Sequence, residues 1–217
     1  QVLAELTEDK IEELAEKAAE SFRFGSNMRG SAQYRRHLAY VLVKRGLKKL
    51  RKEAALDMEI QFILNGKNTT AEAADGTMLL PLLRSLGCYS VKCGCETTNC
   101  GLCTVWIDGV PSLSCSVLAA IVEGKQVTTL EGLQEEAEEF AAFLAAEGAE
   151  QCGFCSPGFV MNVLAMVREL SDPTEEEIKE YLAGNLCRCT GYMGQLRAIK
   201  KYMSQKKENA DMGKEGV

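Results

Sequence analysis

The chain has 217 residues, of which 46% are hydrophobic and 26% charged, a composition typical of a folded globular protein rather than a disordered one. Its longest apolar stretches, near residues 117–122 and 159–167, are far shorter than the roughly 20 residues that a membrane-spanning helix requires. The net charge of −6 is uneven, because residues 1–56 carry 12 Lys and Arg against 8 Asp and Glu while the remainder is acidic, which argues against nucleic-acid binding.

The first 56 residues are predicted to form a helical segment. An amphipathic helix is expected over residues 7–22, where Thr7 is a suitable N-cap and acidic residues occupy the first turn. A second helix is expected from about residue 31 to 55, and the Lys and Arg residues near its end suit the negative pole of the helix dipole. Two helices alone make a poor core, so this segment is expected to pack against another domain.

Residues 57–132 are predicted to form a small α+β domain. Alternating strand residues, MEIQFIL, precede Asn65-Gly66, a hairpin signal because both residues tolerate positive φ. A short helix is expected in MLLPLLRSL, followed by a loop rich in Gly and Cys, a strand TVWI, and a second tight turn at Asp108-Gly109. Strands mixed with one helix indicate an α+β fold.

Strand signals then disappear, and residues 133–205 are predicted to form an all-α domain of four short helices. These helices are expected at residues 135–147, 157–170, 174–183 and 193–205. Pro157 and Pro173 mark helix starts, because proline is tolerated in the first turn, and Gly184 is expected to end the third helix. Residues 206–217 form a polar tail, and the chain is predicted to be frayed from Ser204 onward.

Four cysteines in the α+β region have the spacing of a plant-type ferredoxin. Cys95, Cys100, Cys103 and Cys115 read C-x4-C-x2-C-x11-C, and the first part of this pattern is typical of a 2Fe-2S cluster. The first three lie on one tight loop, and the fourth arrives from beyond the TVWIDG hairpin. Glycines in the loop let the backbone wrap close to the cluster sulfides, since glycine has no Cβ. This set predicts a 2Fe-2S site.

Four further cysteines lie in the helical region. Cys152 and Cys155 read C-x2-C, and Cys187 and Cys189 read C-x-C after an interval of 31 residues. Taken alone, this set fits a four-cysteine zinc site as well as an iron-sulfur cluster. The ferredoxin-like set favours the cluster. Both pairs also fall at predicted helix ends, where free N–H groups can stabilise thiolate and sulfide charge.

Three motifs carry a family resemblance. The stretches VKCGCETTNCGLCTVWIDG, QCGFCSPG and GNLCRCTGY resemble, in order and spacing, the iron-sulfur subunit of molybdenum hydroxylases, the xanthine dehydrogenase and aldehyde oxidoreductase family. The resemblance runs from Met58 to about Tyr202. Thr98 departs from the pattern because many members have glycine there, and Cys93 adds a thiol before the ligand loop. Cys88 and Cys93 are both left unassigned as ligands, since a buried or idle thiol is the simpler interpretation.

The resemblance implies a β-grasp ferredoxin domain with one 2Fe-2S cluster, followed by a four-helix domain with the other. It implies that Gln151 and Cys189 lie against molybdopterin, which places the helical cluster next to that cofactor. Electrons would pass from molybdopterin through the two clusters to FAD, with molybdopterin and FAD held on partner subunits. The chain would then be the electron-transfer part of an enzyme whose substrate site lies on another chain.

A second resemblance concerns the N-terminal segment. The stretch FGSNMRGSAQYRRHLAYVLVKRGLKKL, within residues 1–56, is similar to the C-terminal end of the family's FAD-binding subunit. It suggests a flavin subunit fused ahead of the iron-sulfur subunit. The flavin-binding loops are not part of this sequence, so the chain is not expected to bind FAD unaided.

Two residues near the motifs have competing interpretations. Trp106, in the TVWI strand, is most simply a packing residue. Arg188 lies between two predicted ligands, where its charge could raise the potential of the helical cluster or pair with the pterin phosphate. An ordinary surface ion pair is an equal alternative for Arg188.

The leading hypothesis is an electron relay of a xanthine dehydrogenase-like oxidoreductase that acts on a purine, another N-heterocycle or an aldehyde. The alternative is a zinc-stabilised binding module without a redox role. Ten cysteines, with no secretory signal at the start of the sequence, favour a reducing environment and therefore a cytoplasmic location.

Overall fold

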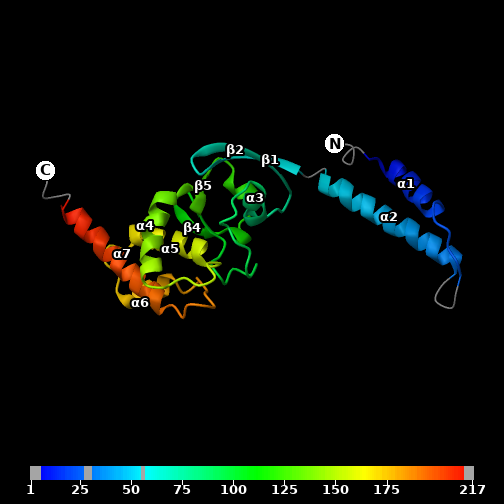
Figure 1. The fold of residues 1–217 in the computed structure, drawn as a ribbon. Helices are drawn as coiled ribbons and strands as arrows, with labels where there is room; N and C mark the ends of the chain where they lie inside the picture. Colours follow the sequence, from blue (N-terminus) through cyan, green and yellow to red (C-terminus); the bar gives the residue numbers. More distant parts are fainter. Residues whose placement is uncertain (1–5, 27–30, 55–56, 213–217) are drawn as a thin grey trace. The chain divides into compact units, whose positions relative to one another are not determined.

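The computed structural model describes residues 6–26, 31–54 and 57–212 (Figure 1). The chain divides into two compact units. The first contains Gln1–Met58 with Glu72–Asp75, and the second contains Glu59–Ala71 with Gly76–Val217. Among the helices of the described residues, none combines the length and apolar character that crossing a membrane requires.

The first unit contains a pair of helices, α1 (Glu8–Glu20) and α2 (Ala32–Ala54). Thr7 caps α1 as predicted, because its hydroxyl accepts a hydrogen bond from the Lys10 N–H at 3.3 Å. The apolar face of α1 is buried against α2, and opposite charges pair across the two helices. The buried residues are Ile11, Ala15 and Ala19, and the ion pairs are Glu8 with Lys48 and Arg51, Glu12 with Lys44, and Glu20 with Arg36.

Five strands form one mixed sheet in the order β2-β1-β5-β3-β4. Their bounds are β1 (Asp57–Leu64), β2 (Lys67–Ala74), β3 (Thr104–Ile107), β4 (Val110–Leu113) and β5 (Gln126–Thr128). β1 runs parallel to β5, while β3 is antiparallel to both β4 and β5. Both predicted hairpin turns are confirmed, since Asn65-Gly66 and Asp108-Gly109 adopt positive φ between their strands.

Helix α3 (Leu79–Ser85) follows the first hairpin, as predicted, and buries four leucines. Three short 3-10 turns complete this part of the chain, at Ser114–Ser116, Ala119–Val122 and Leu130–Gly132. The mixed α+β class expected from the sequence is confirmed.

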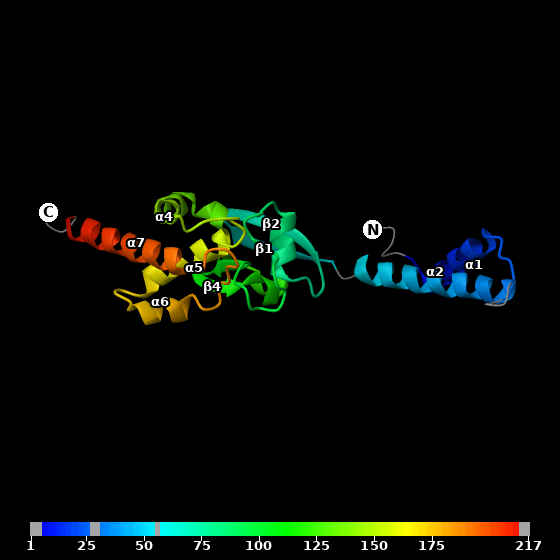
Figure 2. The same cartoon turned by 60° about the horizontal axis from the view of Figure 1, so that its bottom comes forward.

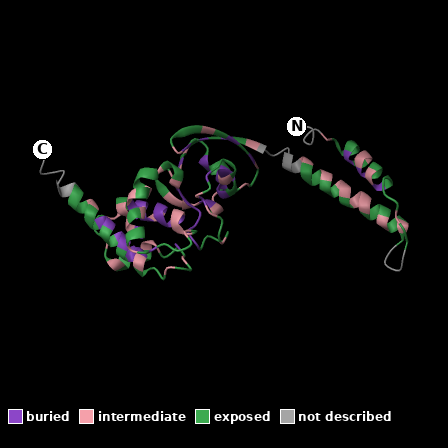
Figure 3. Cartoon of the chain, in the orientation of Figure 1, coloured by how far each residue is buried: buried purple, intermediate pink, exposed green. Residues whose placement is uncertain are grey.

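The helical part contains α4 (Gln134–Ala146), α5 (Ser156–Glu169), α6 (Glu175–Tyr181) and α7 (Met193–Met212). Helix α5 lies between the strands and the outer helix α7 in both views (Figures 1 and 2). It is buried over most of its length, and the buried residues of the unit gather in it and in the adjoining strands (Figure 3). Aromatic rings from three helices meet there, with Phe140 5.2 Å from Tyr202 and 6.2 Å from Phe159 between centroids.

Three details of the predicted helices are corrected. Pro157 lies in the first turn of α5 as expected, but Pro173 precedes the N-cap Thr174 of α6. Helix α6 ends at Tyr181, three residues before Gly184. Helix α7 was predicted over residues 193–205 and instead continues to Met212. Lys206 pairs with Glu139 and Lys207 with Asp172, and these contacts tie the helix end to the rest of the unit.

Trp106 joins the sheet to the helices. Its side chain is 4% exposed, as a packing residue should be, and its indole N–H donates to the Met161 carbonyl oxygen on α5 at 3.1 Å. Arg168, near the end of α5, lies 3.8 Å from the centroid of the indole ring and donates to the Gly109 carbonyl oxygen at 2.9 Å. The β3–β4 hairpin is therefore fastened to α5 at both its strand and its turn.

Replacing Arg168 with Ala is expected to lower the free energy of unfolding by about 1–2 kcal/mol, because both the cation-π contact and the hydrogen bond to Gly109 are lost. Urea denaturation measures the change. Lys207→Ala is the matched control, since it removes an exposed helix ion pair that should contribute less than about 1 kcal/mol. Equal effects of the two variants would contradict the role given to Arg168.

Candidate metal centres

The loop before β3 wraps around the thiol of Cys95. The N–H groups of Thr97 and Asn99 point at the Cys95 sulfur at 3.4 and 3.3 Å. These backbone hydrogen bonds, from Thr97 first and then Asn99, lower the pKa of Cys95 to about 6. The turn needs left-handed residues, and Thr98 has φ 64° and Gly101 φ 70°. The backbone thus prepares Cys95 to hold negative charge.

The remaining thiols of this set are brought together by the β3–β4 hairpin. Cys103 lies just before β3 and Cys115 in the turn just after β4, and the Ser114 hydroxyl donates to the Cys103 carbonyl oxygen at 2.7 Å. Burial, with the neighbouring Cys115 thiol, raises the pKa of Cys103 to about 11. The Cys95 thiol in turn interacts with that of Cys100. The four predicted ligands therefore form two pairs.

The helical set is paired in the same way. Cys152 and Cys155 precede α5, while Cys187 and Cys189 lie on the loop between α6 and α7. The sulfurs of Cys152 and Cys189 are 3.6 Å apart. Burial and the adjacent Cys187 thiol raise the pKa of Cys155 to about 12. The Thr190 hydroxyl donates to the Cys187 sulfur at 3.2 Å.

Paired thiols suit a binuclear cluster. In a 2Fe-2S cluster each iron takes two cysteine thiolates, whereas a structural zinc ion needs four ligands around one centre. Two pairs per set match the donor requirement of two irons, so the residues present fit the cluster. The eight cysteines remain the predicted ligands.

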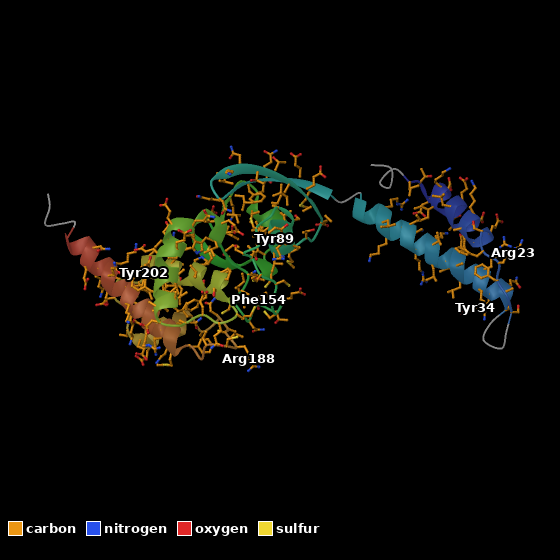
Figure 4. All side chains as sticks on the ribbon, in the orientation of Figure 1. Arg23, Tyr34, Tyr89, Phe154, Arg188 and Tyr202 are labelled. Carbon is orange, nitrogen blue, oxygen red and sulfur yellow. The ribbon has the colours of Figure 1, made fainter. Side chains whose placement is uncertain are left out.

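Gln151 and Cys189, the two residues predicted to contact the pterin, are neighbours. The Gln151 side-chain N–H donates to the Cys189 carbonyl oxygen at 3.0 Å, and both residues are exposed. Arg188 is also exposed and extends at the surface (Figure 4). It forms no ion pair with any side chain of the described ranges, so the surface ion pair considered for it is not found there.

Within the described part of the chain, the thiols of Cys88 and Cys93 do not pair with any of the eight predicted ligand cysteines. Cys88 is buried just after α3, where desolvation raises its pKa. Cys93 is exposed, and its thiol donates to the Glu96 carboxylate at 2.7 Å. Both observations agree with the simpler interpretation, in which neither thiol is a ligand.

The two ligand sets meet at a direct backbone contact. The Leu186 N–H donates to the Cys100 carbonyl oxygen at 3.0 Å. A Cβ built on Gly158 would lie 2.2 Å from the Gly101 carbonyl oxygen, and one on Gly101 would lie 2.5 Å from the Asn185 amide nitrogen. Sequence reasoning identified Gly101 as a loop glycine but missed Gly158 and Asn185. Their position inside the motifs CSPG and GNLC was the available signal.

Comparison with known proteins assigns these elements to families. Residues 62–145 match a 2Fe-2S iron-sulfur cluster binding domain, residues 129–200 a [2Fe-2S] binding domain, and residues 4–50 a CO dehydrogenase flavoprotein C-terminal domain. The xanthine dehydrogenase iron-sulfur-binding subunit of Escherichia coli O157:H7 is 46% identical over 140 residues, covering 61% of this chain and 86% of that protein. This chain belongs to the iron-sulfur subunits of the molybdenum hydroxylases.

Other iron-sulfur subunits of the family agree. The nicotinate dehydrogenase small FeS subunit of Eubacterium barkeri is 39% identical over 154 residues, covering 69% of this chain and 97% of that one. A chain in the crystal structure of quinoline 2-oxidoreductase from Pseudomonas putida 86 superposes with a TM-score of 0.65 at 35% identity, over 69% of this chain and 95% of that one. An electron-transfer role in a xanthine dehydrogenase-like oxidoreductase follows from this membership.

Chemical analysis of the purified protein should find four irons and four acid-labile sulfides per chain, because eight thiolates in four pairs satisfy four irons. The protein should be red-brown, and dithionite should bleach its visible absorption. A colourless protein that holds stoichiometric zinc would support the zinc alternative. Two irons per chain would mean that one of the two cysteine sets holds no cluster.

Gly158→Ala should destabilise the protein by about 2–3 kcal/mol and lower its iron content, because the new Cβ collides with the Gly101 backbone between the two ligand sets. Iron analysis and urea denaturation measure both effects. Gly184→Ala, a neighbour with no heavy atom within 4 Å of its added Cβ, is the control and should change neither. A Gly158→Ala protein with full iron and unchanged stability would refute the close contact.

Proposed function

We propose that this chain relays electrons from molybdopterin through its two 2Fe-2S clusters to FAD, with molybdopterin and FAD held by partner subunits. One observation carries the proposal: the hydrogen bond from the Leu186 N–H to the Cys100 carbonyl oxygen. Leu186 is bonded to the predicted ligand Cys187, and Cys100 is itself a predicted ligand of the other set. A single peptide hydrogen bond thus connects the two sets.

Each cluster, when bound, supplies a centre that accepts and releases one electron. The chain's own residues hold the two centres at a fixed separation and stabilise their charge. The Thr97 and Asn99 amides do so at Cys95, and the Thr190 hydroxyl does so at Cys187. The exposed pair Gln151 and Cys189 forms the edge at which the pterin would dock, so electrons enter at the helical set.

The N-terminal unit supports the proposed position of the flavin. Its matched family is a flavoprotein domain, and α2 exposes three large apolar residues at intervals of four, Tyr34, Leu38 and Leu42. Side chains four residues apart lie on one helix face. We propose that this face packs against the FAD-binding part of the enzyme. We propose that the segment that packs in this way spans residues 1–56.

The proposal also covers the two cluster-binding domains and the location of the protein in the cell. The sheet order with a parallel β1–β5 pair supports a β-grasp ferredoxin domain over residues 57–132. Helices α4 to α7 support a four-helix cluster domain over residues 133–205. Ten cysteines are free thiols rather than halves of disulfides, which supports a reducing, cytoplasmic location.

The substrate is proposed to be an N-heterocycle, with a purine first, or an aldehyde. Relatives of this chain are named for xanthine and nicotinate dehydrogenases, and a structural neighbour is named quinoline 2-oxidoreductase. The residues that bind the substrate would lie on the molybdopterin-bearing subunit. The pocket of the chain that co-purifies with this one would identify the reaction.

Rapid mixing of the assembled enzyme with substrate tests the order of the carriers. In a Cys100→Ser enzyme the helical cluster should still be reduced at the normal rate, while flavin reduction should slow at least tenfold, because serine is a poorer ligand for the ferredoxin-type iron. In a Cys189→Ser enzyme the first reduction of the helical cluster should itself be slow.

Cys93→Ser is the matched control, because this exposed thiol lies on the same loop outside the pairs and should leave both rates unchanged. A Cys100→Ser enzyme whose helical cluster is intact by spectroscopy, yet is not reduced by substrate, would show that the proposed order is wrong.

A further inference from the structure

A cleft with mostly apolar walls lies between α5, α6 and α7, beside the loop that carries Cys187. Its volume is about 320 Å³. The walls come from Phe159 on α5, Ile178 on α6, and Leu196 and Ile199 on α7, all of which are buried. This volume lies at the lower end of the range for small-molecule sites, and it suits a compound of one or two rings.

Gln195 supplies a polar group in this wall that lacks a partner. Its side chain lines the cleft and is 4% exposed, and its Oε1 accepts no hydrogen bond within the described residues. Leaving a buried acceptor unpaired is destabilising. The other buried amide of the wall, Asn185, is satisfied, because its oxygen accepts from the Asn162 amide at 2.6 Å and its nitrogen donates to the Gly158 carbonyl oxygen.

The lining residues of the cleft offer no unpaired charge to a charged ligand. Lys179 is the cation among the lining residues, and it is already paired with Glu175 at 2.6 Å. No free charge remains among the lining residues to hold an anion, and the apolar walls disfavour any ion. The Gln195 amide can turn about its terminal torsion, which is broad for glutamine, and so bring its oxygen to the cleft.

We propose that this cleft binds a neutral one- or two-ring compound that donates one hydrogen bond, from a ring N–H or an O–H, to Gln195 Oε1. The ring occupies the space between Phe159, Leu196 and Ile199, and the single donor satisfies the unpaired oxygen. All the residues that line this cleft belong to the chain itself.

Tyr192 connects the cleft to the helical ligand set. It lies on the rim, and its hydroxyl accepts the N–H of Cys187 at 2.9 Å. A compound that displaces the Tyr192 ring alters a hydrogen bond at the backbone of a predicted ligand. Hydrogen bonding around such ligands tunes a cluster, so occupancy changes the helical cluster and leaves the ferredoxin-type cluster as it was. This second effect rests on the proposed electron relay, whereas the binding does not.

Titration calorimetry of the cluster-loaded chain with methylindole isomers tests the site. 3-Methylindole keeps its N–H and 1-methylindole lacks it, while the two have the same composition. The first should bind about tenfold more tightly, as expected for one buried hydrogen bond. In Gln195→Met, which keeps the length of the side chain without a polar atom, the two isomers should bind equally.

Ala183→Trp provides a variant that does not disturb the core, because Ala183 is exposed at the rim and a tryptophan there closes the cleft. It should abolish binding of both isomers, whereas Ala120→Trp, at an exposed position outside the lining residues, should leave binding intact. Equal binding of the two isomers to the wild type, no binding of either, or undiminished binding to Ala183→Trp would overturn the site.

Electron paramagnetic resonance of the dithionite-reduced protein tests the link through Tyr192. Saturating 3-methylindole should shift the signal of the helical cluster alone. An unchanged spectrum with confirmed binding would overturn the coupling. The binding isotherms are recorded without partner subunits, so they do not depend on the electron relay. A failure of the proposed relay can therefore be distinguished from a failure of the proposed binding site.

Discussion

The relative position of the two ligand sets depends on the contact between Gly101, on the ferredoxin-like ligand loop, and Gly158, in the first turn of α5. A Cβ at Gly158 would lie 2.2 Å from the Gly101 carbonyl oxygen, so backbone touches backbone there. Cys100 precedes Gly101, and Cys155 lies three residues before Gly158. The contact therefore fixes one ligand set against the other, and electron transfer depends on that separation because tunnelling weakens steeply with distance.

A second contact, centred on Trp106, joins the sheet to the helices within the same compact unit. Trp106, a strand residue, belongs to the cluster of buried side chains built mainly by α4, α5 and α7. Its hydrogen bond to Met161 and the stacking of Arg168 hold the β3–β4 hairpin on α5. Cys103 and Cys115 flank that hairpin. Packing of the helices thus reaches the hairpin beside these ligands through Trp106 and Arg168, in addition to the backbone contact at Gly101.

Local signals in the sequence predicted much of this architecture. Asn65-Gly66 and Asp108-Gly109 placed both hairpins, because positive φ at consecutive residues is a property of those residue types. Cysteine spacing defined the two predicted ligand sets. The extent of α7 was missed, because Lys206 is held by Glu139, 67 residues away along the chain. The roles of Gly158, Asn185 and Gln195 also depend on contacts between distant segments, which no local pattern reveals.

Thr98 shows how the ferredoxin-like loop tolerates a residue that suits its backbone poorly. Its φ of 64° is left-handed, and a β-branched side chain is strained there. Hydrogen bonds around Thr97 offset the strain: the Thr98 hydroxyl and the Asn99 amide both donate to the Thr97 carbonyl oxygen, at 2.6 and 2.8 Å. The same turn aims the Thr97 and Asn99 amides at Cys95, so the strained conformation is the one that stabilises the thiolate.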